Sequence, residues 1–461
     1  MLKKFIGDKA FYRRVLLVAV PIIIQNAITN FVALLDNIMV GQVGTVEMSG
    51  VSIINQLMFV FNLCIFGAVS GAGIFTAQYY GSKDDDGVRN TLRFKIISCV
   101  VLTLLGIGVF VFGGELLIKQ YLKGEGDPIQ VANTLESAMG YLKIMLVGLL
   151  PFALSNAYAS TLRETNNGTV PMTGGIIAVV VNLVFNYVLI FGKFGAPKMG
   201  VNGAAIATVL SRYVELAVVA GWSHINRNKH RYFKSVYRSF KMPVRLFKDI
   251  MIKGMPLLIN EAFWASGMAI LNQCYSTRGY DVVAALNIST TLFNLASVVF
   301  LSMGNTVGII IGQMLGAGKS EKEVRAEDTR LIATSVMSCF IFGLLTLSVS
   351  GVFPMIYNTT DSIRALATKL ICVTAVMMPF NAYLNSVYFT LRSGGQTAVT
   401  FIFDSLFVWS VCVPLAYCIS EFTAIAIVPM FFICHAADIL KSAIGAVMIH
   451  QGKWLKTLVG E

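Results

Sequence analysis

The chain repeats itself, and the repeated segment is apolar. Residues 21–81 align with residues 256–316 at a constant offset of 235, without a gap. The aligned identities include Pro21 with Pro256, Ile24 with Ile259, Asn37 with Asn272, Gly44 with Gly279, Ile53 with Ile288, Leu57 with Leu292, Gly73 with Gly308, Gln78 with Gln313 and Gly81 with Gly316. Because Gly, Pro, Asn and Gln recur in register, the two halves of the chain are expected to share one architecture.

The composition places this repeat in a membrane. The chain is 56% hydrophobic and only 13% charged, whereas soluble chains carry about 25% charged residues. A hydrocarbon core needs roughly 20 helical residues to cross it, and backbone polar groups in lipid must be satisfied within the segment. We therefore expect an all-α membrane protein with about twelve transmembrane helices, at 14–40, 50–80, 94–118, 132–162, 168–193, 199–223, 250–277, 283–315, 329–356, 366–391, 397–420 and 422–449.

Positive charge gathers in the connections between these segments. The longest basic stretch runs from Arg227 to Lys248 without an acidic residue. Cytoplasmic loops carry an excess of Lys and Arg, so this stretch is interpreted as a cytoplasmic linker, and no nucleic-acid partner is expected. The same rule puts on that side Lys3, Lys4, Arg13, Arg14, Arg89, Arg93, Lys95, Lys319, Lys322, Arg325, Arg330, Lys453 and Lys456. Both termini are thus predicted to be cytoplasmic, in a multi-pass protein of a prokaryotic inner membrane.

Both halves then begin on the same side, so the repeat is parallel. We predict an N-lobe of six helices at 1–224, a basic linker at 225–249 and a C-lobe of six helices at 250–461. Two pseudo-symmetric lobes of this kind are typical of secondary transporters. The sequence has no HExxH, GxSxG or GxxxxGK[ST] pattern, so we expect neither an enzyme nor ATP hydrolysis. The eight cysteines contain no CxxC pair and are interpreted as small buried hydrophobes.

Charged residues inside the predicted spans cost about 2.5–3.5 kcal/mol each at a helix centre. Arg212 with Glu215, and Asp438 with Lys441, are both spaced i,i+3 and correspond at an offset of 226. Side chains at that spacing share a helix face, so we expect two structural ion pairs.

Asp36, Glu261 and Asp404 have no such neighbour on their own helix. A lone carboxylate in lipid must face water, carry a proton or bind a cation, because burial raises a carboxyl pKa and a nearby cation lowers it. Such a group can exchange H+ for a cation. The alternative is a carboxylate satisfied by neighbouring helices, and this stays open for Glu261 and Asp404 above all.

Asp36 has candidate companions elsewhere in the first half. Asn182 and Asn186 are spaced i,i+4, so both amides point from one face of the fifth span. Thr208 adds a hydroxyl in the sixth span. One carboxylate, two amide carbonyls and a hydroxyl are hard oxygen ligands, and with a single negative charge they favour Na+ as a possible metal ion.

These residues lie in segments that are similar to a known family, the multidrug and toxic compound extrusion (MATE) transporters. The similarity extends over nearly the whole chain. It rests on Pro21 fifteen residues before Asp36, DNIMVG at 36–41, AQYYG at 77–81, LR at 162–163 and 391–392, NLVFN at 182–186, GVNGAAIAT at 200–208, GMP at 254–256 and GQMLGAGK at 312–319. The order and spacing of these motifs over twelve predicted spans make the resemblance specific.

The resemblance implies two six-helix lobes around a central cavity. It implies alternating access driven by an inward Na+ or H+ gradient, with export of organic, often cationic, compounds. Asp36, Asn182, Asn186 and Thr208 match the family's N-lobe cation site position by position. Pro21 matches a first-helix proline linked to helix bending, since Pro removes an intrahelical hydrogen bond.

The family pattern fits the second half less well. Glu261 matches a seventh-helix acid, which some members pair with an Asp on the tenth helix. Here the tenth span carries no acid. Asn381 lies near the expected place, and Asp404 on the eleventh span is a candidate replacement. Glu261, Asn381 and Asp404 are therefore candidates for binding substrate or a second cation.

The prediction is a cation-coupled antiporter, with Na+ or H+ as coupling ion and no other cofactor. It would export organic cations, as drugs or metabolites, and act as a monomer in the lipid bilayer. The alternative is a flippase for lipid-linked substrates of the same superfamily. A major facilitator transporter is disfavoured because its second-to-third loop normally reads GxxxDRxGRR, whereas here residues 81–90 read GSKDDDGVRN.

Overall fold

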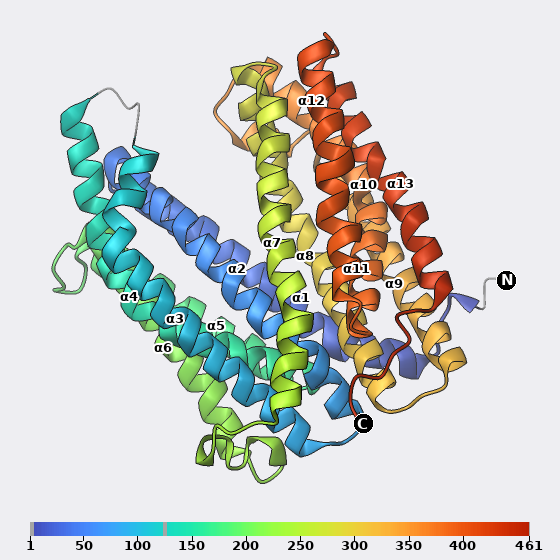
Figure 1. The fold of residues 1–461 in the computed structure, drawn as a ribbon. Coiled ribbons are helices and arrows are strands. Elements are labelled where there is room, and N and C mark those ends of the chain that lie inside the picture. The colour runs from blue at the N-terminus through green and yellow to red at the C-terminus, as the bar shows by residue number, and fades with distance from the viewer. Residues whose placement is uncertain (1–3, 123–126, 461) are drawn as a thin grey trace. The chain divides into compact units, whose positions relative to one another are not determined.

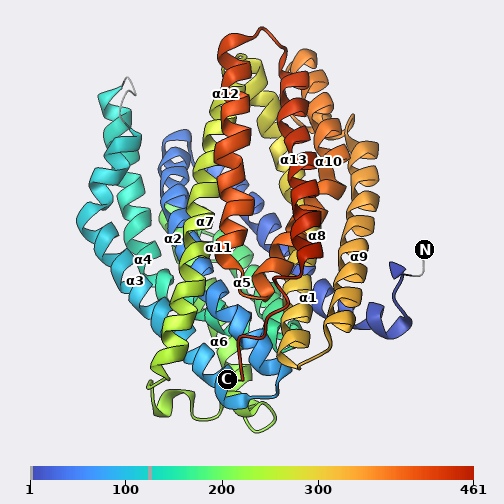
Figure 2. The ribbon, with the colours of Figure 1, turned by 45° about the vertical axis from the view of Figure 1, so that its right-hand side comes forward.

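The computed structural model describes residues 4–122 and 127–460, except for the side chains of Ala33, Leu34, Asn37 and Thr45. Lys3 of the basic N-terminus and the side chain of Asn37 therefore lie outside the described part. Within it the chain forms helices joined by short connections (Figures 1 and 2). The helices are α1 (Lys9–Gly41), α2 (Thr45–Gly81), α3 (Asp85–Tyr121), α4 (Pro128–Glu164), α5 (Thr169–Phe191), α6 (Gly200–Ile225), α7 (Val244–Ser276), α8 (Tyr280–Gly316), α9 (Glu321–Val349), α10 (Asp361–Ser393), α11 (Thr397–Phe401), α12 (Val413–Phe422) and α13 (Ile427–Gln451).

The helices confirm the predicted all-α membrane fold. In the described residues, eleven helical segments are long and apolar enough to cross a membrane. One of them, Thr397–Phe422, runs from α11 through two π-helical turns into α12. The remaining long helix, α7, has 33 residues and carries Lys248, Asp249, Lys253 and Glu261. The architecture thus has twelve long helical segments, as the sequence predicted.

Most helices begin before the apolar span does, because polar residues cap them. Asp84 accepts a hydrogen bond from the backbone N–H of Gly87 at the start of α3, and Asp127 does so from Ile129 at the start of α4. A side-chain oxygen there satisfies an N–H group that has no partner within the helix. The predicted ninth span was too long at its C-terminal end. α9 ends at Val349, and a 3-10 turn at Phe353–Ile356 follows.

The packing divides the chain into two compact units. The N-terminal unit consists of residues 24–76 and 84–250, and the C-terminal unit of residues 1–23, 77–83 and 251–461. In the N-terminal unit, α6 packs on α4 and α5, and α3 packs on α4. In the C-terminal unit, α10 packs on α8, α9 and α13. The lobe boundaries at 224 and 250 stay a prediction.

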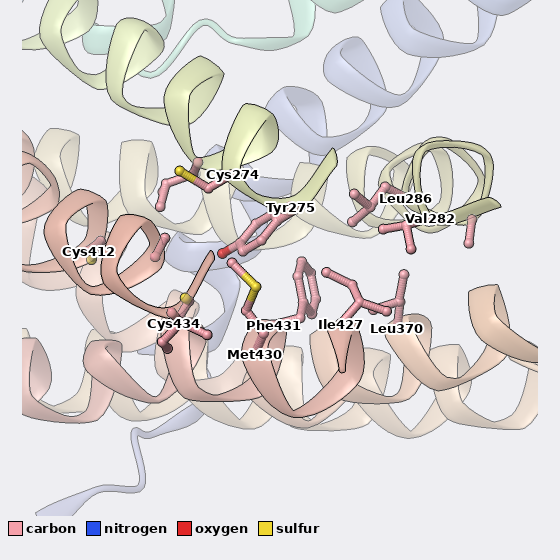
Figure 3. Close-up of a cluster of buried hydrophobic side chains, with 14 of the residues drawn as sticks. Cys274, Tyr275, Val282, Leu286, Leu370, Cys412, Ile427, Met430, Phe431 and Cys434 are labelled. Carbon is pink, nitrogen blue, oxygen red and sulfur yellow. The ribbon is translucent and has the colours of Figure 1, made fainter. Parts of the chain in front are cut away.

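An apolar core fills one end of the C-terminal unit. Figure 3 shows Tyr275 of α7 beside Phe431 of α13, with their rings 5.3 Å apart in an edge-on arrangement. Cys274, Cys412 and Cys434 are buried in this core as free thiols. Apolar side chains of five helical segments are buried here, so the core fixes how α7, α8, α10, α12 and α13 pack.

The basic linker after α6 is folded against α3. Arg93 donates hydrogen bonds to the backbone oxygens of Ser235 and Val236, at 2.9 and 3.0 Å, and Arg89 donates to that of Arg231 at 3.0 Å. Burial, with the charge of Lys229, lowers the pKa of the nearby His230. Two arginines assigned to a connection by the sequence thus belong to α3 and hold the linker in place.

The end of α2 crosses α8 within the C-terminal unit through two glycines of the repeat. A Cβ atom on Gly316 would lie 1.9 Å from the backbone oxygen of Gln78, and one on Gly81 would lie 2.0 Å from that of Gln313. The Gln78 side chain donates to the oxygen of Ser393 at 2.9 Å and accepts from the N–H of Leu458 at 2.7 Å. This reciprocal contact explains why Gly recurs at 81 and 316.

Replacing Gly316 with Ala is expected to lower the thermal stability of the purified protein, because the new methyl group would meet backbone rather than a movable side chain. Overpacking of this kind costs on the order of 1–3 kcal/mol. Gly113→Ala is the matched control, since a Cβ there meets nothing within 4 Å. Thermal denaturation in detergent measures both. Equal melting temperatures for the two variants would contradict the close contact between α2 and α8.

Candidate functional site

The structure brings together the four residues of the predicted cation site, all in the N-terminal unit. Asp36 lies on α1, Asn182 and Asn186 lie one helical turn apart on α5, and Thr208 lies on α6. Asn186 is fully buried and Asn182 is 3% exposed. Two amides on one face of α5 therefore stand between the carboxylate of α1 and the hydroxyl of α6.

These side chains form one hydrogen-bonded chain. The Asn186 amide nitrogen donates to Asp36 Oδ1 at 2.5 Å and to Asn182 Oδ1 at 3.1 Å. The Asn182 amide nitrogen donates to Thr208 Oγ1 at 3.3 Å. Asn186 Oδ1 is buried and has no hydrogen-bond partner in the described part of the chain. A buried oxygen without a donor costs free energy unless something satisfies it, and a cation is one such partner.

The donor set suits a small hard cation. It offers a carboxylate, an amide oxygen and a hydroxyl oxygen, with one formal negative charge. Oxygen ligands of this type hold Na+ and other hard cations, whereas softer metals prefer nitrogen or sulfur. The residues thus fit Na+, and the carboxylate alone suffices for H+.

A cationic side chain that the sequence analysis treated as purely structural lies near this site. Arg212 forms the expected ion pair with Glu215, at 3.4 Å, which confirms that prediction. Its charge also acts on Asp36, and its guanidinium stands 4.8 Å from the centre of the Phe152 ring. A signal was present, because Arg212 follows Thr208 by four residues and so shares its face of α6.

Pro21 lies inside α1, and the helix continues through it from Lys9 to Gly41. Its side chain is buried in the C-terminal unit, which ends on α1 at Ile23. The bending role given to Pro21 by the resemblance stays a prediction.

The second predicted ion pair was wrong. Lys441 of α13 does not pair with Asp438 on its own helix; its ammonium lies 2.7 Å from Asp404 Oδ1. Asp438 instead lies 3.9 Å from His435 Nδ1. Asp404 occupies a π-helical turn at Ile402–Leu406, followed by a second at Val408–Cys412. Asp438 and Lys441 share the regular helix α13, and spacing along one helix compares only residues of that helix, so it did not predict a contact with Asp404 on another.

Asp404 therefore has partners from two neighbouring helices. Besides Lys441, the Asn260 amide nitrogen of α7 donates to Asp404 Oδ2 at 3.2 Å. Ser405 donates to Asn260 Oδ1 at 2.7 Å and so orients that amide. Asp404 is thus a carboxylate satisfied by neighbouring helices, which was the alternative left open by the sequence.

Glu261 lies next to Asn260, and the charges of Asp404 and Arg392 act on its carboxyl group. The structure therefore brings Glu261 and Asp404 together in the C-terminal unit. Asn381 is half-buried on α10 and makes no hydrogen bond with the described residues of this group. Asn381 is thus not part of the hydrogen-bonded network around Asp404.

A further buried pair was missed by the sequence analysis. Lys95, which the sequence assigned to a basic connection, is fully buried on α3. Its ammonium lies 2.5 Å from Glu164 Oε2 of α4 and donates to the hydroxyls of Ser160 and Thr161, at 3.0 and 3.1 Å. Ser160 precedes Glu164 by four residues and donates to the other carboxylate oxygen at 2.5 Å. Lys95 is thus an interior structural group of the N-terminal unit.

Comparison with known proteins agrees with this geometry. The profile of the family described as MatE matches residues 21–188 and 256–418, and thus both copies of the repeat. The chain belongs to the MatE family. Members of this family are transporters rather than enzymes, which confirms the sequence prediction on both points.

Curated relatives of the chain carry names of drug-resistance proteins. A protein of Thermotoga maritima named "Probable multidrug resistance protein NorM" is 23% identical over 451 residues, which cover 96% of this chain and 92% of the relative. "Multidrug resistance protein MdtK" of Yersinia pseudotuberculosis serotype O:1b is 25% identical over 423 residues, covering 88% and 87%. The MatE chain thus aligns with these relatives over almost their full length.

Solved structures confirm the fold. A structure titled "Outward-facing conformation of a multidrug resistance MATE family transporter of the MOP superfamily" superposes with a TM-score of 0.86 at 19% identity. It covers 97% of this chain and 98% of the other. The all-helical architecture is therefore the one that MATE transporters adopt.

Lys95→Met is expected to lower stability strongly, because it leaves Glu164 buried beside two hydroxyls without its cation. Breaking a buried ion pair costs about 3–5 kcal/mol, whereas removing both charges is often neutral. Thermal denaturation should thus show a large loss for Lys95→Met and partial recovery for Lys95→Met with Glu164→Gln. Two equally destabilised variants would mean that packing, and not the unpaired charge, sets the loss.

Proposed function

We propose that this MatE protein is a cation-coupled antiporter that exports organic cations by alternating access. The observation that carries the proposal is the buried chain of Asp36, Asn186, Asn182 and Thr208, with its unsatisfied amide oxygen on Asn186. The names of the relatives favour drugs or metabolites as substrates over lipid-linked sugars. Na+ is the first candidate for the coupling ion, because the site offers oxygen ligands only.

The coupling follows from competition for one negative charge. The Asn186 amide nitrogen donates a hydrogen bond to Asp36 Oδ1. A bound cation takes the place of that N–H group, and rotation of the amide about its last side-chain bond presents Asn186 Oδ1 to the ion. This rearrangement changes how α1 and α5 are held together. Ion and substrate then favour different states, and each lowers the affinity for the other reciprocally.

Arg212 adjusts the strength of this site. Its guanidinium is paired with Glu215 yet close enough for its charge to act on Asp36. A neighbouring positive charge weakens cation binding without forming an ion pair with the carboxylate. The site is therefore suited to bind an ion and also to release it, which a transport cycle requires.

Asp36→Asn is expected to abolish gradient-driven efflux while the protein still inserts, because the amide carries no charge to bind an ion. Ethidium efflux from proteoliposomes, with a Na+ or a pH gradient imposed in turn, measures this. Asp281→Asn is the matched control, since Asp281 is exposed in the first turn of α8. Wild-type efflux in the Asp36 variant would contradict the role of Asp36.

Thr208→Val is expected to reduce the apparent Na+ affinity of efflux by about tenfold, since a lost ligand worth roughly 1.4 kcal/mol changes an equilibrium constant by that factor. Thr208→Ser keeps the hydroxyl and should stay near wild type. Efflux rates over a Na+ concentration series distinguish the two. Wild-type efflux that follows the pH gradient and not the Na+ gradient would assign H+ as the coupling ion. Absence of any gradient-dependent efflux would favour the flippase alternative.

A further inference from the structure

The two units treat their buried carboxylates differently. In the N-terminal unit, Asp36 accepts its hydrogen bond from a neutral amide, and no Lys or Arg of the described residues forms an ion pair with it. In the C-terminal unit, Asp404 carries an ammonium group at 2.7 Å on Oδ1 and an amide N–H on Oδ2. One carboxylate is left open to a cation, and the other already holds one.

The surroundings of Lys441 keep its ammonium at Asp404. The side chain is 8% exposed, and its nitrogen lies 5.2 Å from the centre of the Phe403 ring and 5.8 Å from that of Phe407. The negative faces of aromatic rings attract a cation. Two faces and one carboxylate thus surround the ammonium, all from the π-helical stretch of one helix.

The oxygen groups around Asp404 otherwise resemble a site for a free cation. Asn260 donates a hydrogen bond to one Asp404 oxygen, and Ser405 donates one to the Asn260 side chain. The Glu261 carboxylate is near enough for its charge to interact with Asp404. What distinguishes this group from the Asp36 site is the covalently attached ammonium. A group tethered to the same protein competes at a high effective concentration, so a free ion at millimolar concentration is at a disadvantage.

We propose that Lys441 acts as a tethered cation that occupies the cation position at Asp404 in the C-terminal unit, so that this unit takes up no Na+. Asp36 is then the single coupling-ion site, and one ion is exchanged per cycle. That Asp36 binds the coupling ion rests on the proposed function. The exclusion of Na+ by Lys441 depends only on the residues around Asp404 and can be tested by measuring ion binding instead of transport.

The test uses the full chain with Asp36→Asn, which removes the N-terminal site, and equilibrium binding of radioactive Na+ to the purified protein. With Lys441 present, no Na+ should be bound. Lys441→Met keeps the length and apolar stem of the side chain but removes the charge, and it should create a site for one Na+ per chain. Adding Asp404→Asn should remove that site again. Lys441→Arg is the matched control: it keeps a positive charge beside Asp404, so this variant should bind no Na+.

Two results would overturn the proposal. One is Na+ binding that needs Asp404 while Lys441 is intact, because the lysine would then not exclude the ion. The other is a folded Lys441→Met protein that binds no Na+, which would make the pair structural only. If Lys441→Met does not fold, the wild type is compared with the double variant that carries Asp404→Asn and Lys441→Met. The two proteins are expected to bind the same number of Na+ ions. A lower number in the double variant would refute the proposal.

The outcome is distinguishable from failure of the proposed function. Absence of gradient-driven ethidium efflux in the wild type would contradict the antiport proposal and leave the Na+ count of the Asp36→Asn series unaffected. Conversely, gradient-driven efflux together with Na+ binding at Asp404 while Lys441 is intact would contradict only the proposal about Lys441.

Discussion

Backbone hydrogen bonding in hydrocarbon is the constraint on which the rest of this structure depends. Lipid offers no partner for an N–H or C=O group, so each crossing segment must close its own hydrogen bonds and becomes a helix. Side chains then have to satisfy the backbone groups at helix ends and allow helices to approach each other. Capping residues such as Asp84 and Asp127 satisfy helix starts, and the crossing of α2 and α8 requires two glycines.

The same scarcity of partners governs the buried charges. Lys95 is matched by a carboxylate and two hydroxyls, and Lys441 by Asp404 between two aromatic rings. Asp36 differs, because it accepts a hydrogen bond from the Asn186 amide, whose own buried oxygen has no donor among the described residues. This incomplete hydrogen-bond network is the observation on which the proposed cation site at Asp36 rests.

The repeat sets a shared framework, and the chemistry departs from it. Gln78 and Gly81 meet Gln313 and Gly316, their own counterparts in the second half, which shows why the two glycines recur. By contrast, Glu215 pairs with Arg212 on its own helix, whereas Lys441, its counterpart at the offset of 226, pairs with Asp404 on another helix. Duplication thus preserved the residues that let helices approach, while the interior charges diverged.

The sequence by itself determined the helical membrane fold, the repeat and the family, because apolar length, periodicity and motif order can be read along the chain. It also named Asp36, Asn182, Asn186 and Thr208 as candidates, but only the tertiary structure brought these residues of α1, α5 and α6 together. Only the tertiary structure decided that Lys441 pairs with Asp404, that Lys95 is interior and that Asn381 stands apart from this network. Such contacts join different helices and depend on how each is rotated about its axis. Residue spacing along one helix does not reveal that rotation.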